Sequence, residues 1–155
     1  MPRGWSASSI FFMRLRKQGH CAYKCEYHLV LTSKYRRKIF NEGSFAYLRE
    51  LITSFHEMLP EVEVLEINHD VDYVHLLLSI PPKMRVSDVV RTFKSYTGRL
   101  MKKRFEYMRK AYWGADGIWS DGYFVSTVGI GESVIKRYIQ NQGEEDTGQA
   151  QLELK

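Results

Sequence analysis

Two kinds of hydrophobic spacing alternate along the 155-residue chain, and their order predicts an α+β fold. Apolar residues at every second position are typical of half-buried strands, and apolar residues three or four positions apart are typical of helices. The predicted order is strand, helix, strand, strand, helix, strand and a final helix. This order is the ferredoxin-like, or RRM-like, arrangement of an antiparallel sheet with helices on one face, with an added C-terminal helix.

The first half of the chain supplies three strands and one helix. Residues 1–18 are expected to be a flexible leader, and an alternation of apolar and polar residues predicts a strand over 21–32. Apolar residues at helical spacing predict a helix from about 43 to 58, which Pro60 ends. Residues 61–67 and 71–80 predict two more strands, the second with an apolar face formed by its even-numbered positions.

The second half begins with a long helix after Pro81 and Pro82, reaching about residue 110, with Ser87 as its expected N-cap. A last strand is predicted over 119–128, followed by a glycine-containing break at 129–131 and a short helix over 132–142. The acidic, polar tail 143–155 is expected to fray. Residues 19–142 are therefore predicted to form the single domain.

The charge distribution points to a nucleic acid partner. The net charge is +5, but the tail 143–155 carries −3, so the preceding residues carry +8. Residues 83–110 alone hold ten basic side chains against Asp88 and Glu106. Together with 14% aromatic residues, this composition predicts binding to DNA or RNA.

Other classes of protein are disfavoured. The apolar runs are too short to span a membrane, and the first twenty residues lack the apolar core of a signal peptide. Cys21 and Cys25 would lie about 13 Å apart in a strand, too far for a disulfide. Reduced thiols and a cytoplasmic location are expected, with no small-molecule cofactor.

Three residues carry candidate chemistry. Tyr138 and Gln142 are four residues apart and share one face of the final helix. Spacing alone favours a tyrosine at the edge of the core and a solvated glutamine. His75 lies on the polar face of its strand, where it could face a metal or a phosphate, although a lone histidine is more often structural.

Four blocks in order resemble the IS200/IS605-type transposases, which are single-tyrosine members of the HUH endonuclease superfamily. The blocks are residues 27–36, 72–78, 119–129 and 138–142, and the resemblance covers about residues 20–142. It implies an enzyme that binds a hairpin in single-stranded DNA and cuts and rejoins strands through a covalent 5′-phosphotyrosine. It also implies assistance by Mg²⁺ or Mn²⁺ and a homodimer, in which the tyrosine helix can complete the partner's site.

The resemblance implies catalytic and metal-binding roles for particular residues of this chain. Tyr138 matches the nucleophile, and His75 and Gln142 match metal ligands. The family has a histidine where this chain has Tyr73, so three outcomes are open: Tyr73 ligates weakly or through water, His69 or Asp72 compensates, or metal binding is lost. The last outcome would leave a protein that binds a DNA or RNA hairpin without cutting it.

DNA contacts are expected from basic and aromatic side chains, and from His28 on the non-core face of the first strand, near the candidate site. Tyr35, Tyr96 and Trp119 could stack on unpaired bases, although packing in the core or on the surface is the commoner role of an aromatic side chain. The candidate DNA-binding residues are His28, Lys34, Arg36, Arg37, Lys83, Arg85, Arg91, Lys94, Arg99, Lys102, Lys103 and Arg104.

Overall fold

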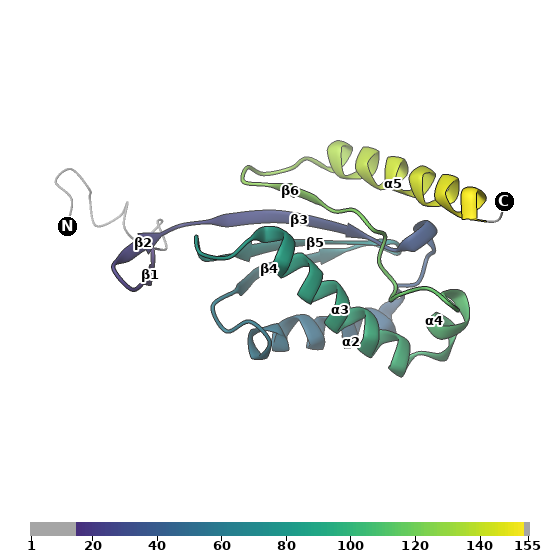
Figure 1. Ribbon diagram of the computed structural model, residues 1–155, viewed down its shortest axis with the longest axis horizontal. Helices are drawn as coiled ribbons and strands as arrows, with labels where there is room; N and C mark the ends of the chain where they lie inside the picture. The colour runs from purple at the N-terminus through teal and green to yellow at the C-terminus, as the bar shows by residue number, and fades with distance from the viewer. Residues whose placement is uncertain (1–14, 154–155) are drawn as a thin grey trace.

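A computed structural model describes residues 15–153 and contains a four-stranded antiparallel sheet (Figure 1). Its strands are β3 (Glu26–Thr32), β4 (Glu63–His69), β5 (Tyr73–Ser79) and β6 (Phe124–Ser126), in the spatial order β4-β5-β3-β6. The first of these strands therefore lies between the third and the fourth. The predicted ferredoxin-like arrangement is confirmed.

Two helices cover one face of the sheet, and a third covers part of the other. Helices α2 (Glu42–Thr53) and α3 (Val86–Arg104) lie below the sheet in Figure 1, and α5 (Glu132–Glu153) lies above it. The 3-10 turn η2 (Ser54–Glu57) continues α2. Asn41 caps α2 because its side chain accepts the Ser44 N–H at 2.9 Å, in a reciprocal capping box.

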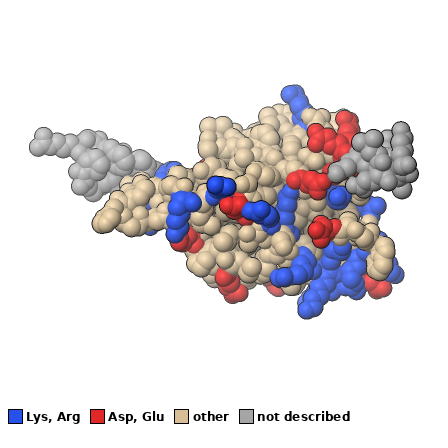
Figure 2. Space-filling model, viewed as in Figure 1, with Lys and Arg blue, Asp and Glu red and all other residues tan. Residues whose placement is uncertain are grey.

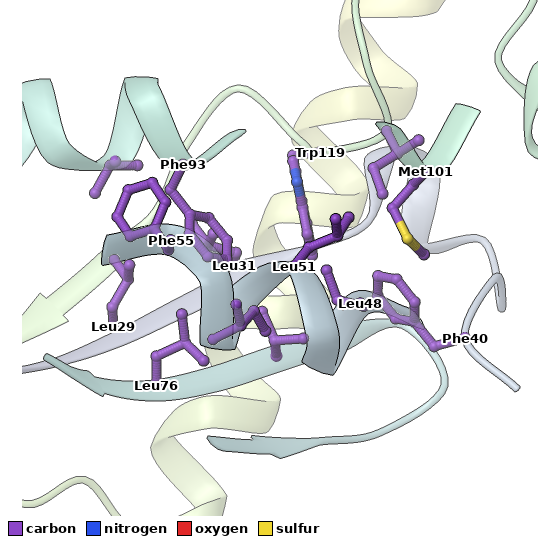
Figure 3. Packing of buried hydrophobic residues seen from close by; sticks show 14 of the residues in the cluster. Leu29, Leu31, Phe40, Leu48, Leu51, Phe55, Leu76, Phe93, Met101 and Trp119 are labelled. Atoms are coloured by element: carbon purple, nitrogen blue, oxygen red, sulfur yellow. The ribbon is translucent and has the colours of Figure 1, made fainter. Parts of the chain in front are cut away.

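The strand alternation divides the residues between two faces. Leu29 pairs with Leu76 and Leu31 with Val74, and these side chains enter the main core with α2 and α3. Figure 3 shows Leu29, Leu31 and Leu76 packed with Phe55 and Phe93. The opposite face carries the intervening residues of β3 and β5, which include His28 and His75 but also the apolar Val30 and Leu77.

Four expected boundaries were wrong. The strand predicted over 21–32 is split into β2 (Cys21–Tyr23) and β3, and β2 pairs with β1 (Arg16–Gln18). The end of the expected leader is thus a strand, while residues 1–14 of it lie outside the described residues. Helix α3 begins one residue before Ser87 and has Arg85 at its N-cap, without a side-chain hydrogen bond. Phe105 interrupts the helix, and α4 (Glu106–Ala111) follows.

The last strand and the last helix also differ from expectation. Only Phe124–Ser126 pairs as β6, and Trp119 forms an isolated bridge with Ser33. Between them, Lys94 binds the carbonyl oxygens of residues 120–122. Helix α5 continues to Glu153 rather than ending at Gln142. The residues expected to fray are therefore helical as far as 153.

Two sequence-based exclusions can be compared with the structure. Within residues 15–153, no helix is long and apolar enough to cross a membrane. Cys21 and Cys25 are both free thiols, as predicted.

Candidate active site

Helix α5 crosses the sheet face that α2 and α3 leave open. Ile135 and Ile139 on the helix pack against Val30 on β3 and form a second, smaller core. The rings of Tyr73, Phe124 and Tyr138 border this cluster. The four-residue spacing of Ile135 and Ile139 therefore fixes which face of α5 meets the sheet, and Tyr138 lies beside that face.

The Tyr138 hydroxyl is buried and has no hydrogen-bond partner. Its ring lies 5.7 Å from that of Phe124, centroid to centroid. Burial, together with the carboxylates of Asp146 and Glu145, raises the pKa of the Tyr138 phenol well above its ordinary value. An unpartnered buried hydroxyl is costly, so it calls for an explanation in function.

Gly122 brings Tyr138 and Gln142 together. A Cβ atom at Gly122 would lie 2.5 Å from Gln142 Oε1 and 3.4 Å from Tyr138 Oη. A larger residue at Gly122 would therefore displace the amide of Gln142, which is buried. The two residues predicted to share a helix face thus meet at one loop.

Asp146 is a buried neighbour of Gln142 that sequence reasoning missed. Its side chain is 2% exposed and accepts hydrogen bonds from the Ser120 hydroxyl and the Tyr35 backbone N–H, both at 2.9 Å. The Gln142 amide also donates to it, at 3.4 Å. The only sequence signal was its position one helical turn after Gln142, in a segment expected to fray.

His75 has a histidine beside it on the next strand. His75 Nε2 lies 3.1 Å from His28 Nδ1, and both rings are half-buried on the face that carries α5. Burial and the neighbouring His28 lower the pKa of His75, against an opposing effect of Glu66. The sequence predicted His28 only as a DNA contact. It did not predict that His28 would lie beside His75.

Tyr73 occupies an apolar position near α5. It packs against the cluster of Val30, Ile135 and Ile139. Burial raises the pKa of its phenol, as do the carboxylates of Asp70, Glu132 and Asp72, while Lys136 has the opposite effect. Tyr73 is therefore a neutral phenol near neutral pH, which makes it a weak ligand for a hard cation.

The two suggested substitutes for Tyr73 have other contacts. His69 pairs in register with Val74, a residue of the main core, and its ring stacks on Phe45 at 3.3 Å. The Asp72 carboxylate lies 3.4 Å from Arg36 Nε. Among residues 15–153, no hydrogen bond or ion pair joins either of them to His75.

The predicted basic residues have different surroundings. Figure 2 shows Lys and Arg gathered over the end of the molecule where Figure 1 places α4. Arg91, Lys94, Arg99 and Lys102 line a groove of about 700 Å³ beside Asp121. Lys83 and Arg91 form surface ion pairs with Glu61 and Asp88 respectively, and Arg85, Arg99, Lys103 and Arg104 are exposed.

Two lysines of this groove bind loop carbonyls. Lys94 Nζ donates to Ser120 O at 2.7 Å, Asp121 O at 3.2 Å and Gly122 O at 2.8 Å. Burial lowers the pKa of Lys94 to about 8. Lys102 Nζ similarly donates to Tyr112 O and Ala115 O. These contacts give both lysines a structural role in holding the loops that border the groove.

The remaining candidates lie near the turn η1 (Lys34–Arg36) or in the core. Lys34 Nζ is 3.8 Å from Asp121, and the Arg37 guanidinium lies over the Tyr35 and Tyr112 rings. Trp119 packs in the core rather than being free to stack on bases, because it is 4% exposed and its indole N–H donates to the Thr97 hydroxyl. Tyr96 also packs on the core, and Tyr35 is half-buried.

Comparison with known proteins agrees with the predicted fold and family. The family model for IS200-like transposases matches residues 21–142. The transposase for insertion sequence element IS200 of Salmonella typhimurium is 34% identical over 138 residues, covering 87% of this chain and 88% of that protein. The ISDra2 transposase TnpA of Deinococcus radiodurans is 26% identical over 138 residues, with 88% and 97% coverage.

Solved structures agree. A candidate transposase of Deinococcus radiodurans R1 superposes with a TM-score of 0.71 at 28% identity, covering 82% of this chain and 97% of that one. A REP-associated tyrosine transposase, solved with a REP hairpin, shares the fold at a TM-score of 0.50 and 13% identity, with 80% and 68% coverage. The match over residues 21–142 establishes that the chain is a DNA transposase of the IS200-like family.

Proposed function

We propose that this transposase cuts and rejoins single-stranded DNA through Tyr138, after binding a hairpin at the end of its element. The observation that supports this most strongly is the Tyr138 hydroxyl, which is buried without a partner beside Gln142. A hydroxyl in a merely structural role is expected to have a hydrogen-bond partner. The REP-associated tyrosine transposase shares the fold and was solved bound to a hairpin, which supports the choice of a hairpin substrate.

The proposed reaction exchanges one phosphate ester for another. The Tyr138 oxygen forms a bond to phosphorus while the bond from phosphorus to the DNA 3′ oxygen breaks. The phenol proton leaves to solvent, and the departing 3′ oxygen takes up a proton. The 5′ end stays attached to the protein as a phosphotyrosine, and rejoining reverses the step.

The donor atoms present fit a divalent ion such as Mg²⁺ or Mn²⁺. His75 offers a half-buried imidazole, and Gln142 offers an amide oxygen. A bound ion would polarise the non-bridging oxygens of the phosphate. Tyr73 contributes least to such a site, because its ring belongs to the apolar cluster beneath α5.

We propose that α5 moves, or is supplied by a second subunit, when the site assembles on DNA. Among the hydrogen bonds of residues 15–153, none joins Tyr138 or Gln142 to His28 or His75. Gly129 and Gly131, which precede α5, are exposed and have open space around them. We propose that this segment is the hinge by which α5 reaches the histidines in a homodimer.

The test uses a labelled single-stranded hairpin substrate with Mg²⁺ or Mn²⁺. The wild type should form a covalent protein–DNA band that Tyr138→Phe lacks, whereas Tyr123→Phe, a substitution in the segment before β6, should retain it. Hairpin binding without a covalent band in either metal would contradict the proposal that the protein cuts DNA through Tyr138. That result would favour the alternative function, a protein that binds the hairpin but no longer cuts it. The observation behind this alternative is that Tyr73 stands where the family has a histidine.

A further inference from the structure

We infer that His28 supplies the second imidazole of the metal site, in place of the histidine that Tyr73 replaces. This inference rests on the proposed metal-assisted function and adds a ligand from a different strand. It starts from one observation, the 3.1 Å separation between His28 Nδ1 and His75 Nε2.

The sheet register fixes the two histidines side by side. Val30 pairs with His75 and Leu77 pairs with His28, so the two histidines are diagonal neighbours on one face of adjacent strands. Both strands are central in the sheet, with β4 and β6 outside them. A pair of ligands on such a rigid frame is held in place before any ion arrives.

The nitrogen separation suits a shared ion. Two imidazole nitrogens at about 2.1 Å from one ion, at an angle of about 90–110°, lie about 3.0–3.4 Å apart. The observed 3.1 Å falls in this range, with the ring planes inclined at 42°. A small rotation of the rings would change a nitrogen-to-nitrogen hydrogen bond into two lone pairs directed at one point.

The surroundings favour an open site for a hard ion. Glu66 pairs in register with Leu77 and Asn68 with His75, so strand β4 places oxygen-bearing side chains on the same face. In the described part of the chain, no three His, Cys, Asp or Glu side chains form a complete metal cluster. The histidine pair therefore leaves coordination positions for water, for DNA phosphate and for the Gln142 of a repositioned α5.

Tyr73 is a poorer candidate on geometric grounds. It pairs with Thr32 at the end of β3, and its ring packs against Val30, Ile135 and Ile139. His28 instead lies within hydrogen-bond distance of the His75 nitrogen. The proposed ligand is thus the neighbour across the sheet rather than the neighbour two residues earlier in the chain.

The test adds Mn²⁺ to the full-length, DNA-free protein and follows the histidine side chains by NMR. The ring signals of His28 and His75 should broaden together at substoichiometric Mn²⁺. His20 and His56, which lie outside strands β3, β4 and β5, should broaden only at higher concentrations, and they serve as internal references. Broadening of His75 without His28, or equal broadening of all five histidines, would overturn the inference.

Affinity measurements on variants provide the second arm. In a Mn²⁺ titration followed by EPR, His28→Ala and His28→Gln should each weaken Mn²⁺ binding at least tenfold. Tyr73→Phe and the matched control His69→Ala should change the Mn²⁺ affinity less than twofold. Using two His28 variants with unchanged melting curves separates ligand loss from unfolding. A His28 variant that binds like the wild type, or a loss with Tyr73→Phe, would contradict the assignment.

These outcomes are separate from those of the proposed function. Tyr138→Phe should keep normal Mn²⁺ binding while losing the covalent band. If the wild type forms no band but Mn²⁺ binds at His28 and His75, the strand-cutting proposal fails and the metal site stands. If the band forms and His28→Ala binds Mn²⁺ normally, the strand-cutting proposal stands and the assignment of His28 as a metal ligand fails.

Discussion

The Asp146 carboxylate accepts the backbone N–H of Tyr35 at 2.9 Å, joining two residues that are 111 positions apart. Tyr35 belongs to η1, where both it and Arg36 have positive φ angles of 60° and 52°. These conformations are uncommon for non-glycine residues, so the hydrogen bond to the Asp146 carboxylate helps to stabilise this turn. The acidic end of α5 thus holds the tyrosine helix against the turn that follows β3.

Removing the Asp146 carboxylate should loosen α5. Asp146→Ala leaves the Tyr35 N–H and Ser120 hydroxyl without their acceptor, which should lower the free energy of unfolding by about 2 kcal/mol. Asp146→Asn keeps one acceptor oxygen and should cost less. Hydrogen exchange should become faster along α5 in Asp146→Ala but not in Glu144→Gln, a matched change at an exposed position of the same helix. Equal exchange in the two variants would contradict this role.

Tyr138→Phe should stabilise the protein while abolishing the covalent band. The substitution removes a buried hydroxyl without a partner, so the free energy of unfolding should rise by about 1 kcal/mol at neutral pH. The control is Tyr112→Phe, because the Tyr112 hydroxyl is also enclosed but donates to Lys34 O at 2.8 Å. This control should lose about 1 kcal/mol in the same denaturant titration.

The stability gained by Tyr138→Phe should grow at alkaline pH. Burial raises the pKa of Tyr138 in the folded protein, whereas the unfolded phenol keeps its ordinary value near 10. Both states are protonated at neutral pH. Above about pH 10 the unfolded chain loses the proton first, so wild-type stability falls as pH rises. Phenylalanine lacks this effect, and a constant difference between about pH 8 and 10.5 would contradict the raised pKa.

Adding a methyl group at Gly122 should damage the site more than the fold. In Gly122→Ala the new Cβ meets the Gln142 amide oxygen at 2.5 Å, which forces Gln142 away from its position beside Tyr138. The covalent band should weaken at least tenfold, and hairpin affinity should change little. Gly43→Ala makes only an ordinary 3.6 Å contact in α2 and should leave both measurements unchanged.

Much of the fold could be predicted because the hydrophobic alternation identifies both the strands and the faces that meet α2 and α3. The pairing of His28 with His75 could not, since it depends on the register between β3 and β5, which no local pattern specifies. Asp146 was missed for a related reason. Its contacts lie on η1 and on the loop after Trp119, far away in the sequence. The polar sequence around Asp146 does not indicate which of its carboxylates is buried.

The basic residues were the least predictable part, because charge alone does not distinguish a phosphate contact from an internal hydrogen-bond donor. The side chain of Arg91 is 78% exposed, while Lys94 binds three loop carbonyls. Both residues line the same groove. A paired experiment on these two residues separates the two roles.

Lys94→Met should destabilise the protein by about 2 kcal/mol, because the carbonyl oxygens of residues 120–122 lose their shared donor. Arg91→Ala should leave stability within about 0.5 kcal/mol, since an exposed ion pair contributes little. Hairpin binding should show the opposite pattern when measured against salt concentration. Arg91→Ala should reduce the slope of log affinity against log salt by about one, as expected when one phosphate contact is lost. A larger change of slope in Lys94→Met than in Arg91→Ala would mean that the lysine turns from the loop to the DNA.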